Sequence, residues 1–324
     1  MYTLNNYDQF LVKKPMSDPL VLRLLSVIKK SFPEIVFSRY QFVEHTYGSY
    51  VILIGNEQKF EKTFKFPREQ RTILKTIPEI LLLRYLCPIV GVAIPYPEHI
   101  CDTGSSFPGL FWGYPFIDGY QLTNERFIQS VKKVPIAKQI GEFLSAIHTT
   151  ELHKIDTIGL QKIDYYEYIL SSWIRFHEAT SPAVLNGKYQ WVRKFVTSYL
   201  ARGEYFDFDY VLVHGDLGHE HICVDYRNES ITGFLDFTEA HIGDAAYDFA
   251  VLCLTYGFHV YSNIRNFYYD KSNEGLFNRR VAAYACLHCI NAIAEGLDSN
   301  DINQALYGEK LLPRAKTLVE LAFK

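Results

Sequence analysis

The stretch of sequence that decides the fold runs Val213-His214-Gly215-Asp216-Leu217-Gly218-His219-Glu220-His221 and is followed, after an intervening hairpin, by Leu235-Asp236-Phe237. Apolar and β-branched residues around it predict three short strands, at 210–214, 221–224 and 231–237. A turn is expected at 226–229, between the last two strands. The polar side chains gather at the ends of these strands. Functional groups are commonly placed on loops held by a rigid scaffold, so we expect the chemistry of the protein here.

The residue types in this stretch suit phosphoryl transfer. In that reaction one carboxylate orients the acceptor hydroxyl and accepts its proton, while other side chains hold magnesium against the phosphates of a nucleotide. Asp216, in a loop that follows a strand, fits the first role. His221 and Asp236 could converge as metal ligands, because a hairpin between them would keep their separation fixed.

A further motif, Gly243-Asp244-Ala245-Ala246-Tyr247-Asp248-Phe249-Ala250, lies downstream. Together with Asp216, His221 and Asp236, it resembles the aminoglycoside phosphotransferase family, whose signature at this point is Gly-Asp-Pro-Ala-Tyr-Asp-Leu-Ala. The resemblance implies an α+β, protein-kinase-like bilobal fold with a β-rich N-lobe and a mainly helical C-lobe. It also implies ATP or GTP as phosphoryl donor, Mg²⁺ as cofactor and a small-molecule hydroxyl as acceptor.

Two positions depart from the family's usual pattern. His221 stands where asparagine is usual, although 2″-type aminoglycoside kinases and macrolide kinases resemble this form with histidine. Because Mg²⁺ prefers oxygen ligands, such a site should rely more on Asp236. Thr238 stands where protein kinases have a glycine after the metal-binding aspartate, a change that is common in this family.

The N-terminal third supplies the rest of a nucleotide site. Residues 61–68 resemble the family's strand that ends in Lys-Phe-Pro, which implies that Lys65 reaches the α- and β-phosphates. Glu79, which we expect to open the next helix, would be the ion-pair partner that orients this lysine. Lys62 is a competing candidate, but odd–even counting puts it on the same face of the strand as Phe64.

Two loops would complete the nucleotide site. The turn His45-Thr46-Tyr47-Gly48-Ser49 would cover the phosphates, with Ser49 among the contacts, although its one glycine is a weak signal. Residues 111–119 resemble the family's hinge, where backbone groups read the purine edge. Pro115 has no N–H and can only accept there, so the donor would be Ile117 or a neighbour.

The pattern along the chain changes from strand-rich to helix-rich. Helical periodicity is expected at 20–30, and helices again at 79–86 and 136–148. Antiparallel strands are expected within 42–54 and 59–66, with turns at Gly48 and Gly55-Asn56. We therefore expect an N-terminal nucleotide-binding lobe at 1–113, a hinge at 114–119, and a helical C-terminal lobe with the catalytic loop and acceptor site at 120–324.

Composition excludes several other classes of protein. The 324 residues include 33 Lys and Arg and 36 Asp and Glu. The chain therefore has no excess of positive charge that would favour binding to nucleic acid or to an anionic membrane surface. The 6 cysteines are scattered rather than spaced as a disulfide scaffold. No uninterrupted apolar run reaches the roughly 20 residues of a membrane span. We expect a cytoplasmic protein that works on small molecules; the sequence does not specify its oligomeric state.

The acceptor is the least specified part of the prediction. A polycationic aminoglycoside needs an acidic cleft, and Glu239 is the acid best placed to meet an ammonium group. A second acidic cluster, Glu295, Asp298 and Asp301, is explained equally well by a solvated helix end. Aromatic surface could instead suit a macrolide, supplied by Tyr256, Phe258, Tyr261, Phe267, Tyr268 and Tyr269.

We rank an aminoglycoside first, a macrolide second, and a housekeeping metabolite such as choline or a sugar third. A catalytically silent nucleotide-binding module is an alternative of another class, but such a module has no need of Asp216. Structural roles are expected for Asp248, which would brace the catalytic loop, and for Asp244, which would hold a turn. Cys286 and Cys289 are expected to be core residues of a long apolar helix.

Overall fold

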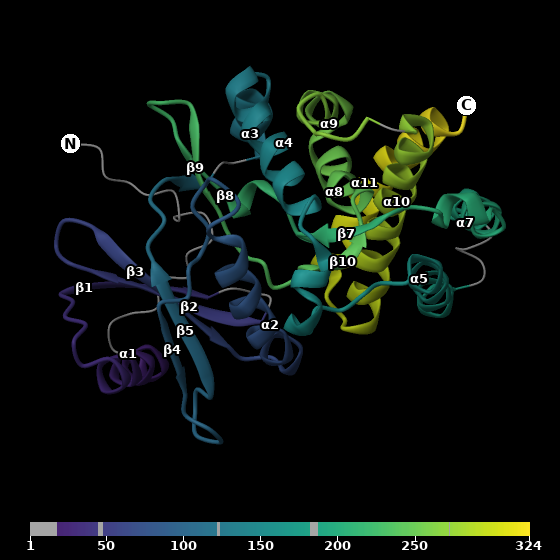
Figure 1. The fold of residues 1–324 in the computed structure, drawn as a ribbon. Helices are drawn as coiled ribbons and strands as arrows, with labels where there is room; N and C mark the ends of the chain where they lie inside the picture. The colour runs from purple at the N-terminus through teal and green to yellow at the C-terminus, as the bar shows by residue number, and fades with distance from the viewer. Residues whose placement is uncertain (1–17, 45–47, 122–123, 182–186, 272) are drawn as a thin grey trace. The chain divides into compact units, whose positions relative to one another are not determined.

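The computed structural model describes residues 18–44, 48–121, 124–181, 187–271 and 273–324 (Figure 1). The chain folds into two compact units, each made of several segments. Unit 1 comprises Met1–Glu125, His153–Gly159 and His219–Glu239, and unit 2 comprises Arg126–Leu152, Leu160–Gly218 and Ala240–Lys324. The predicted lobes divide the chain at one place, the hinge at 114–119. In the structure, residues 219–239 group instead with the N-terminal residues.

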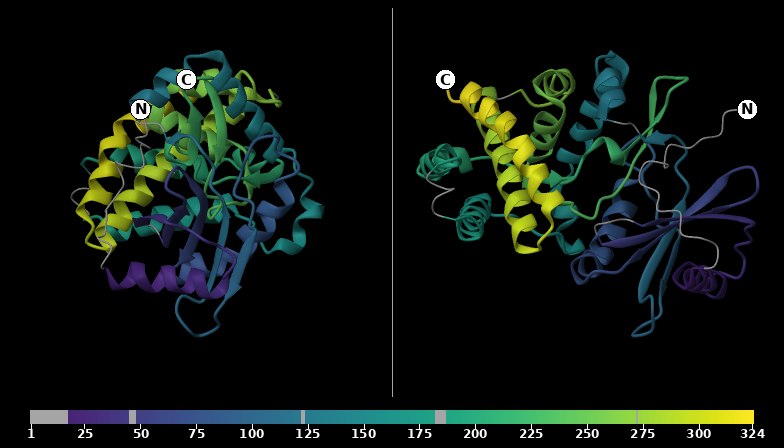
Figure 2. Two further views of the ribbon diagram at one scale, coloured as in Figure 1. Left: turned by 90° about the vertical axis from the view of Figure 1, so that its left-hand side faces the viewer. Right: turned by 180° about the vertical axis from the view of Figure 1, so that it is seen from behind.

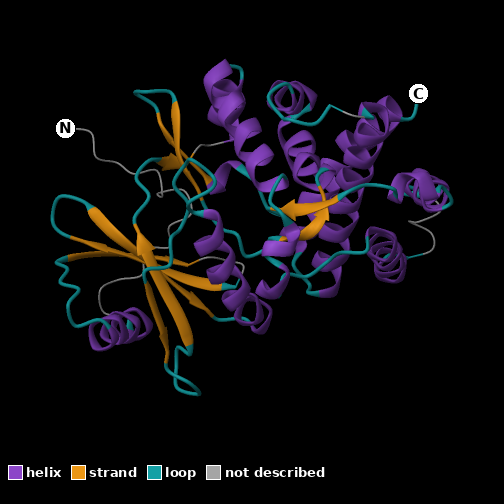
Figure 3. Ribbon diagram, in the orientation of Figure 1, coloured by secondary structure: helices purple, strands orange, loops and turns teal. Residues whose placement is uncertain are grey.

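An antiparallel five-stranded sheet forms the centre of unit 1. Its strand order is β1-β2-β3-β5-β4, with bounds Arg39–Glu44, Ser49–Gly55, Phe60–Pro67, Leu110–Pro115 and His99–Asp102. Figure 3 shows these strands in orange. The turn expected at Gly48 separates β1 from β2, and Gly48 has the left-handed φ of +103° that favours glycine.

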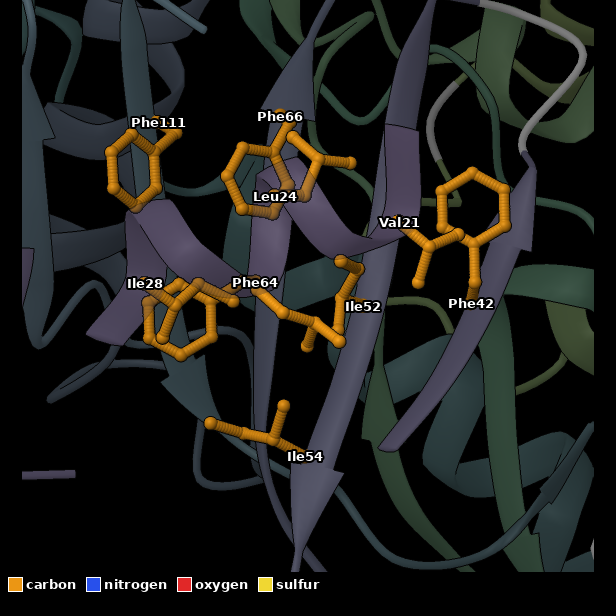
Figure 4. Packing of buried hydrophobic residues seen from close by; sticks show 10 residues of the cluster. Val21, Leu24, Ile28, Phe42, Ile52, Ile54, Phe64, Phe66 and Phe111 are labelled. Carbon is orange, nitrogen blue, oxygen red and sulfur yellow. The ribbon is translucent and has the colours of Figure 1, made fainter. Parts of the chain in front are cut away.

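Helix α1 (Pro19–Ser31) covers one face of this sheet. Its buried residues recur with helical spacing, and Asp18 caps its first turn by accepting hydrogen bonds from Leu20 and Val21. Figure 4 shows the resulting core, in which the helix packs on aromatic and β-branched side chains of four strands. The sticks labelled there are Val21, Leu24, Ile28, Phe42, Ile52, Ile54, Phe64, Phe66 and Phe111.

The other face of strand β3 carries the candidate lysine. Side chains alternate along a strand, so Phe64 and Phe66 pack toward α1 while Lys65 points the other way, toward helix α2 (Gln70–Leu86). The prediction that Glu79 opens this helix is wrong. The helix begins at Gln70 and contains Pro78, so Glu79 lies on its third turn.

A smaller three-stranded sheet also belongs to unit 1. It joins β6 (Tyr120–Gln121), β8 (Ile222–Asp225) and β9 (Ser230–Phe234) in the order β6-β8-β9, preceded by the short 3-10 turn η5 (His219–His221). The backbone N–H of Phe234 donates to the carbonyl of Ala93, which ties the hairpin to the segment after α2. Another short turn, η3 (Asp156–Ile158), contacts α2.

Unit 2 is mainly helical and contains one small antiparallel ribbon, β7 (Tyr210–Val213) with β10 (His241–Asp244). Helices α10 (Glu274–Asp298) and α11 (Ile302–Ala322) pack side by side, as the yellow pair in Figure 2 shows. The remaining elements are α3 (Asn124–Val131), α4 (Val134–His148), η2 (Leu152–Lys154), α5 (Tyr165–Ala179), α7 (Gln190–Leu200), η4 (Gly203–Phe206), α8 (Ala246–Tyr256) and α9 (Phe258–Arg265).

The expected fold class is confirmed, with a β-sheet N-terminal region and a helical C-terminal part. Cys286 and Cys289 are buried in α10, as predicted for core residues. Among the residues that the structure describes, no helix has the length and apolar character needed to cross a membrane.

Candidate active site

Lys65 lies at the centre of a buried polar cluster in unit 1. Its Nζ donates to both carboxylate oxygens of Glu79, at 2.9 and 3.1 Å, and to Oδ1 of Asp236 at 3.0 Å. It also contacts the Thr238 hydroxyl at 2.6 Å. The predicted pairing of Lys65 with Glu79 is present, and Lys62 instead pairs with Glu98 near the surface.

The charges of this cluster fix the protonation of the lysine. Burial alone would lower the pKa of Lys65, but the carboxylates of Asp236 and Glu79 raise it, so the ammonium form is held. Burial raises the pKa of Glu79, while the charge of Lys65 opposes that change. One buried ammonium group therefore faces two carboxyl groups.

His221 and Asp236 fit the metal-binding role that the sequence suggests. His221 Nε2 lies 3.9 Å from Asp236 Oδ2, a separation that two ligands of one ion can have, while Oδ1 of the same carboxylate is used by Lys65. Asp236 has a left-handed φ of 58°, a conformation that aspartate tolerates better than most residues. In the described part of the chain, no group of three or more His, Cys, Asp or Glu side chains is arranged so that it could hold a metal ion.

Residues 214–218, which include Asp216, belong to unit 2, and Asp248 supports this loop segment through hydrogen bonds. The carboxylate of Asp248, in the first turn of α8, accepts from the backbone N–H of His214 at 2.9 Å and of Gly215 at 2.8 Å. The backbone N–H of Asp216 in turn donates to His214 Nδ1 at 3.3 Å. The predicted bracing role of Asp248 is confirmed, and the loop that carries Asp216 is held through its backbone.

Asp248 is itself held by a buried histidine. His148 at the end of α4 contacts Asp248 Oδ2 through Nε2 and the Tyr268 hydroxyl through Nδ1, each at 2.9 Å. Burial would raise the pKa of Asp248, but the hydrogen bond from His148 and the loop N–H groups lower it. Asp244 likewise holds a turn, by accepting from the N–H of Ala246.

Glu239 has basic partners on helix α2. Its two carboxylate oxygens accept from Arg71 Nη2 at 2.6 Å and from Lys75 Nζ at 2.5 Å. These contacts, like the hydrogen bond from Thr238 to Glu79, were not anticipated from the sequence. The four-residue spacing of positions 71, 75 and 79 would have indicated one helix face, but the helix was expected to begin only at Glu79.

The remaining nucleotide-site predictions fall on β2 and β5. Ser49 is buried at the start of β2, whereas residues 45–47 of the predicted phosphate turn lie outside the described residues. Pro115 ends β5, and the next N–H, from Phe116, donates to the carbonyl of Glu61. Ile117 is thus the next backbone donor along the hinge segment, which keeps it the predicted purine contact.

The structure bears on two groups of residues that were considered for the acceptor surface, and for the first it favours the helix-end alternative. Glu295 and Asp298 pair with Arg175, and Asp301 caps α11, so this acidic cluster is a structural helix end. Half of the aromatic residues that suggested a macrolide surface are also core residues, since packing between helices buries Tyr256, Tyr261 and Tyr268.

A lysine paired with a glutamate, an adjoining aspartate beside a histidine, and a braced loop aspartate are the parts of a phosphotransferase with a protein-kinase-like fold. The sequence profile of the phosphotransferase enzyme family matches residues 37–288. This chain belongs to that family and is a phosphotransferase.

Several solved structures share this fold. The GDP and kanamycin complex of APH(2″)-IIia is 22% identical, with a TM-score of 0.81 over 91% of this chain and 99% of that chain. The gentamicin complex of APH(2″)-IIa is 17% identical, with a TM-score of 0.68 over 94% and 100%. The macrolide 2′-phosphotransferase MphH from Brachybacterium faecium is 18% identical, with a TM-score of 0.69 over 90% and 97%. A comparison with curated proteins finds no match.

Proposed function

We propose that the protein transfers the terminal phosphoryl group of ATP or GTP to a hydroxyl of a small molecule, with an aminoglycoside as the first candidate acceptor. The observation that carries the proposal is the Lys65–Glu79–Asp236 cluster, in which two acids hold a buried lysine on the central strand of the five-stranded sheet. Burying charged groups is costly, and such clusters gather at functional sites. The braced loop that presents Asp216 supplies the second half of the chemistry.

Each residue has one task in this reaction. Lys65 binds the nucleotide's phosphates, and Glu79 orients it. Asp216 accepts the proton of the acceptor hydroxyl as the new P–O bond forms and the bond to the nucleoside diphosphate breaks. His221 and Asp236 would hold Mg²⁺, which neutralises charge on the phosphates when it is bound. Ser49 and the backbone of Pro115 and Ile117 would contact the nucleotide.

The ranking of acceptors follows from what the structure and the comparisons support. Structures of aminoglycoside 2′-phosphotransferase-IIIa give TM-scores of 0.82 and 0.81, against 0.69 and 0.63 for two macrolide 2′-phosphotransferases. The aromatic argument for a macrolide is weakened by the burial of Tyr256, Tyr261 and Tyr268. A macrolide remains second because Asp236-Phe237-Thr238-Glu239-Ala240 resembles the macrolide kinases' Asp-Trp-Thr-Glu-Ala.

The direct test is a coupled nucleotide-turnover assay with Mg²⁺, run with ATP and with GTP against kanamycin, gentamicin, a macrolide and choline. Stimulation by an aminoglycoside alone is the expected result. Stimulation by the macrolide or by choline alone would reassign the acceptor. Nucleotide binding with no turnover, in the wild type and in Asp216→Ala alike, would instead support the silent binding module.

Lys65→Ala is expected to reduce kcat/KM for the nucleotide by about 10²–10³-fold, because the substitution removes the phosphate-binding cation and leaves Glu79 facing Asp236. Steady-state kinetics with varied nucleotide measures the effect. Lys62→Ala is the matched control, since Lys62 lies on the same strand and pairs with Glu98. Unchanged kinetics in Lys65→Ala, with a loss in Lys62→Ala, would transfer the role to Lys62.

A further inference from the structure

Three successive turns of α2 contact the short segment that follows the metal-binding aspartate. Arg71, Lys75 and Glu79 are spaced by four residues and therefore lie along one face of the helix. The first two bind Glu239, and the third accepts from the Thr238 hydroxyl at 3.2 Å. All of these residues belong to unit 1.

Glu239 carries a charge that matches these partners. Its side chain is 32% exposed, as is that of Lys75 at 33%, so the contact is only partly screened by solvent. Partial burial would raise the pKa of Glu239, but the hydrogen bonds and charges of Lys75 and Arg71 lower it. The carboxylate is therefore ionised, and each of its oxygens already accepts from a cation.

We propose that Glu239 is a positioning residue for the phosphate-binding lysine, and that it acts by pinning the first two turns of α2 through Arg71 and Lys75. An α-helix is stiff over a few turns, so fixing these turns fixes where Glu79 lies on the next one. Glu79 then keeps Lys65 in place. The inference rests on the proposed phosphotransferase function and replaces the acceptor-binding role suggested for Glu239 by the sequence.

The same contacts link the lysine to the metal-binding position. Thr238 donates to Glu79 and lies 2.6 Å from Asp236 Oδ1, and Glu239 is the next residue along the chain. Movement of α2 away from this segment would therefore break the Glu79 and Glu239 contacts together. An ammonium group of an acceptor would have to displace two cations that the chain itself provides.

The test compares Glu239→Gln with the wild type in two measurements. We expect kcat to fall about three- to tenfold, as for the loss of two partly exposed ion pairs, with acceptor KM within about twofold. Backbone amide hydrogen exchange in residues 70–77 should become faster. Glu239→Asp keeps the charge and should recover most of kcat.

The matched control is Glu98→Gln, which breaks the Lys62 ion pair in the same unit at 27% and 38% exposure and should leave kcat unchanged. A charge swap isolates the pairing. Arg71→Glu with Lys75→Glu should lower kcat, and adding Glu239→Lys should restore part of it.

The outcomes separate the inference from the function on which it rests. A wild type without turnover on any acceptor would refute the proposed function, and hydrogen exchange in α2 would still decide the role of Glu239. With an active wild type, a rise in acceptor KM at constant kcat and unchanged exchange would assign Glu239 to the acceptor. Unchanged kinetics and exchange would equally overturn the positioning role.

Discussion

Asp216→Asn is expected to lower kcat by about 10²–10⁴-fold while leaving the melting temperature within about 1 °C of the wild type. The amide has the size of the carboxylate but cannot accept the proton of the acceptor hydroxyl. The loop should keep its shape, because the contacts of His214 and Gly215 with Asp248 hold it, and the substitution leaves these contacts in place. Single-turnover phosphoryl transfer and calorimetry measure the two quantities.

Asp225→Asn is the control for this substitution. Asp225 holds an exposed turn of the β8–β9 hairpin by accepting from the Arg227 N–H, and asparagine keeps the accepting oxygen. Turnover should be unchanged in this variant. The opposite outcome is a large fall in the melting temperature of Asp216→Asn, with a loss of unfolding free energy as large as the rise in activation free energy. It would show that Asp216 is structural and that the base is another group.

Local patterns predict the parts of the site that depend on one element. Alternation along β3 places Lys65 opposite Phe64 and Phe66, and the structure has Lys65 on the face that meets α2. The strands around Asp216 also follow from short sequence signals, because turns and strand ends are specified by nearby residues. The bracing role of Asp248 was instead expected from the family resemblance of residues 243–250, since its partners lie more than thirty residues away.

The start of α2 could not be predicted from its proline. The helix was expected at 79–86, directly after Pro78, and proline is common in the first turn of a helix but rare in its interior. Here Pro78 lies inside the helix. Because proline has no N–H, the carbonyl of Leu74, one turn earlier, lacks its helical hydrogen bond. Leu74 is 68% exposed, so water can satisfy that carbonyl and the internal proline is tolerated.

Contacts between distant segments were beyond the reach of sequence patterns. The hairpin of β8 and β9 joins unit 1 through pairing with β6 and the Phe234 contact with Ala93, more than a hundred residues away along the chain. The burial of Tyr256 and Tyr268 likewise depends on which helices pack over them. The number of aromatic residues in the sequence does not show which of them lie at the surface and which are buried between helices.

Asp248→Ala is expected to lower the free energy of unfolding by about 3–5 kcal/mol and the melting temperature by roughly 5–15 °C. The substitution leaves the buried N–H of His214, the half-buried N–H of Gly215 and the side chain of His148 without their acceptor. A buried donor that loses its partner keeps the full cost of desolvation. Turnover should fall as well, because the same N–H groups hold the loop of Asp216. Denaturant unfolding and calorimetry at pH 7 measure the loss.

Asp164→Ala is the matched control, since Asp164 also accepts from two backbone N–H groups, at the exposed start of α5, and its loss should cost only about 1 kcal/mol. The pH dependence gives a second check. The pKa of Asp248 is lowered from the ordinary 3.8, so its stabilisation is complete above that pH and disappears as the pH falls through the lower folded-state pKa. The difference between wild type and Asp248→Ala should therefore be constant from about pH 5 to 8 and shrink in acid. A difference that persists unchanged in acid would assign the cost to lost packing rather than to the ionised carboxylate.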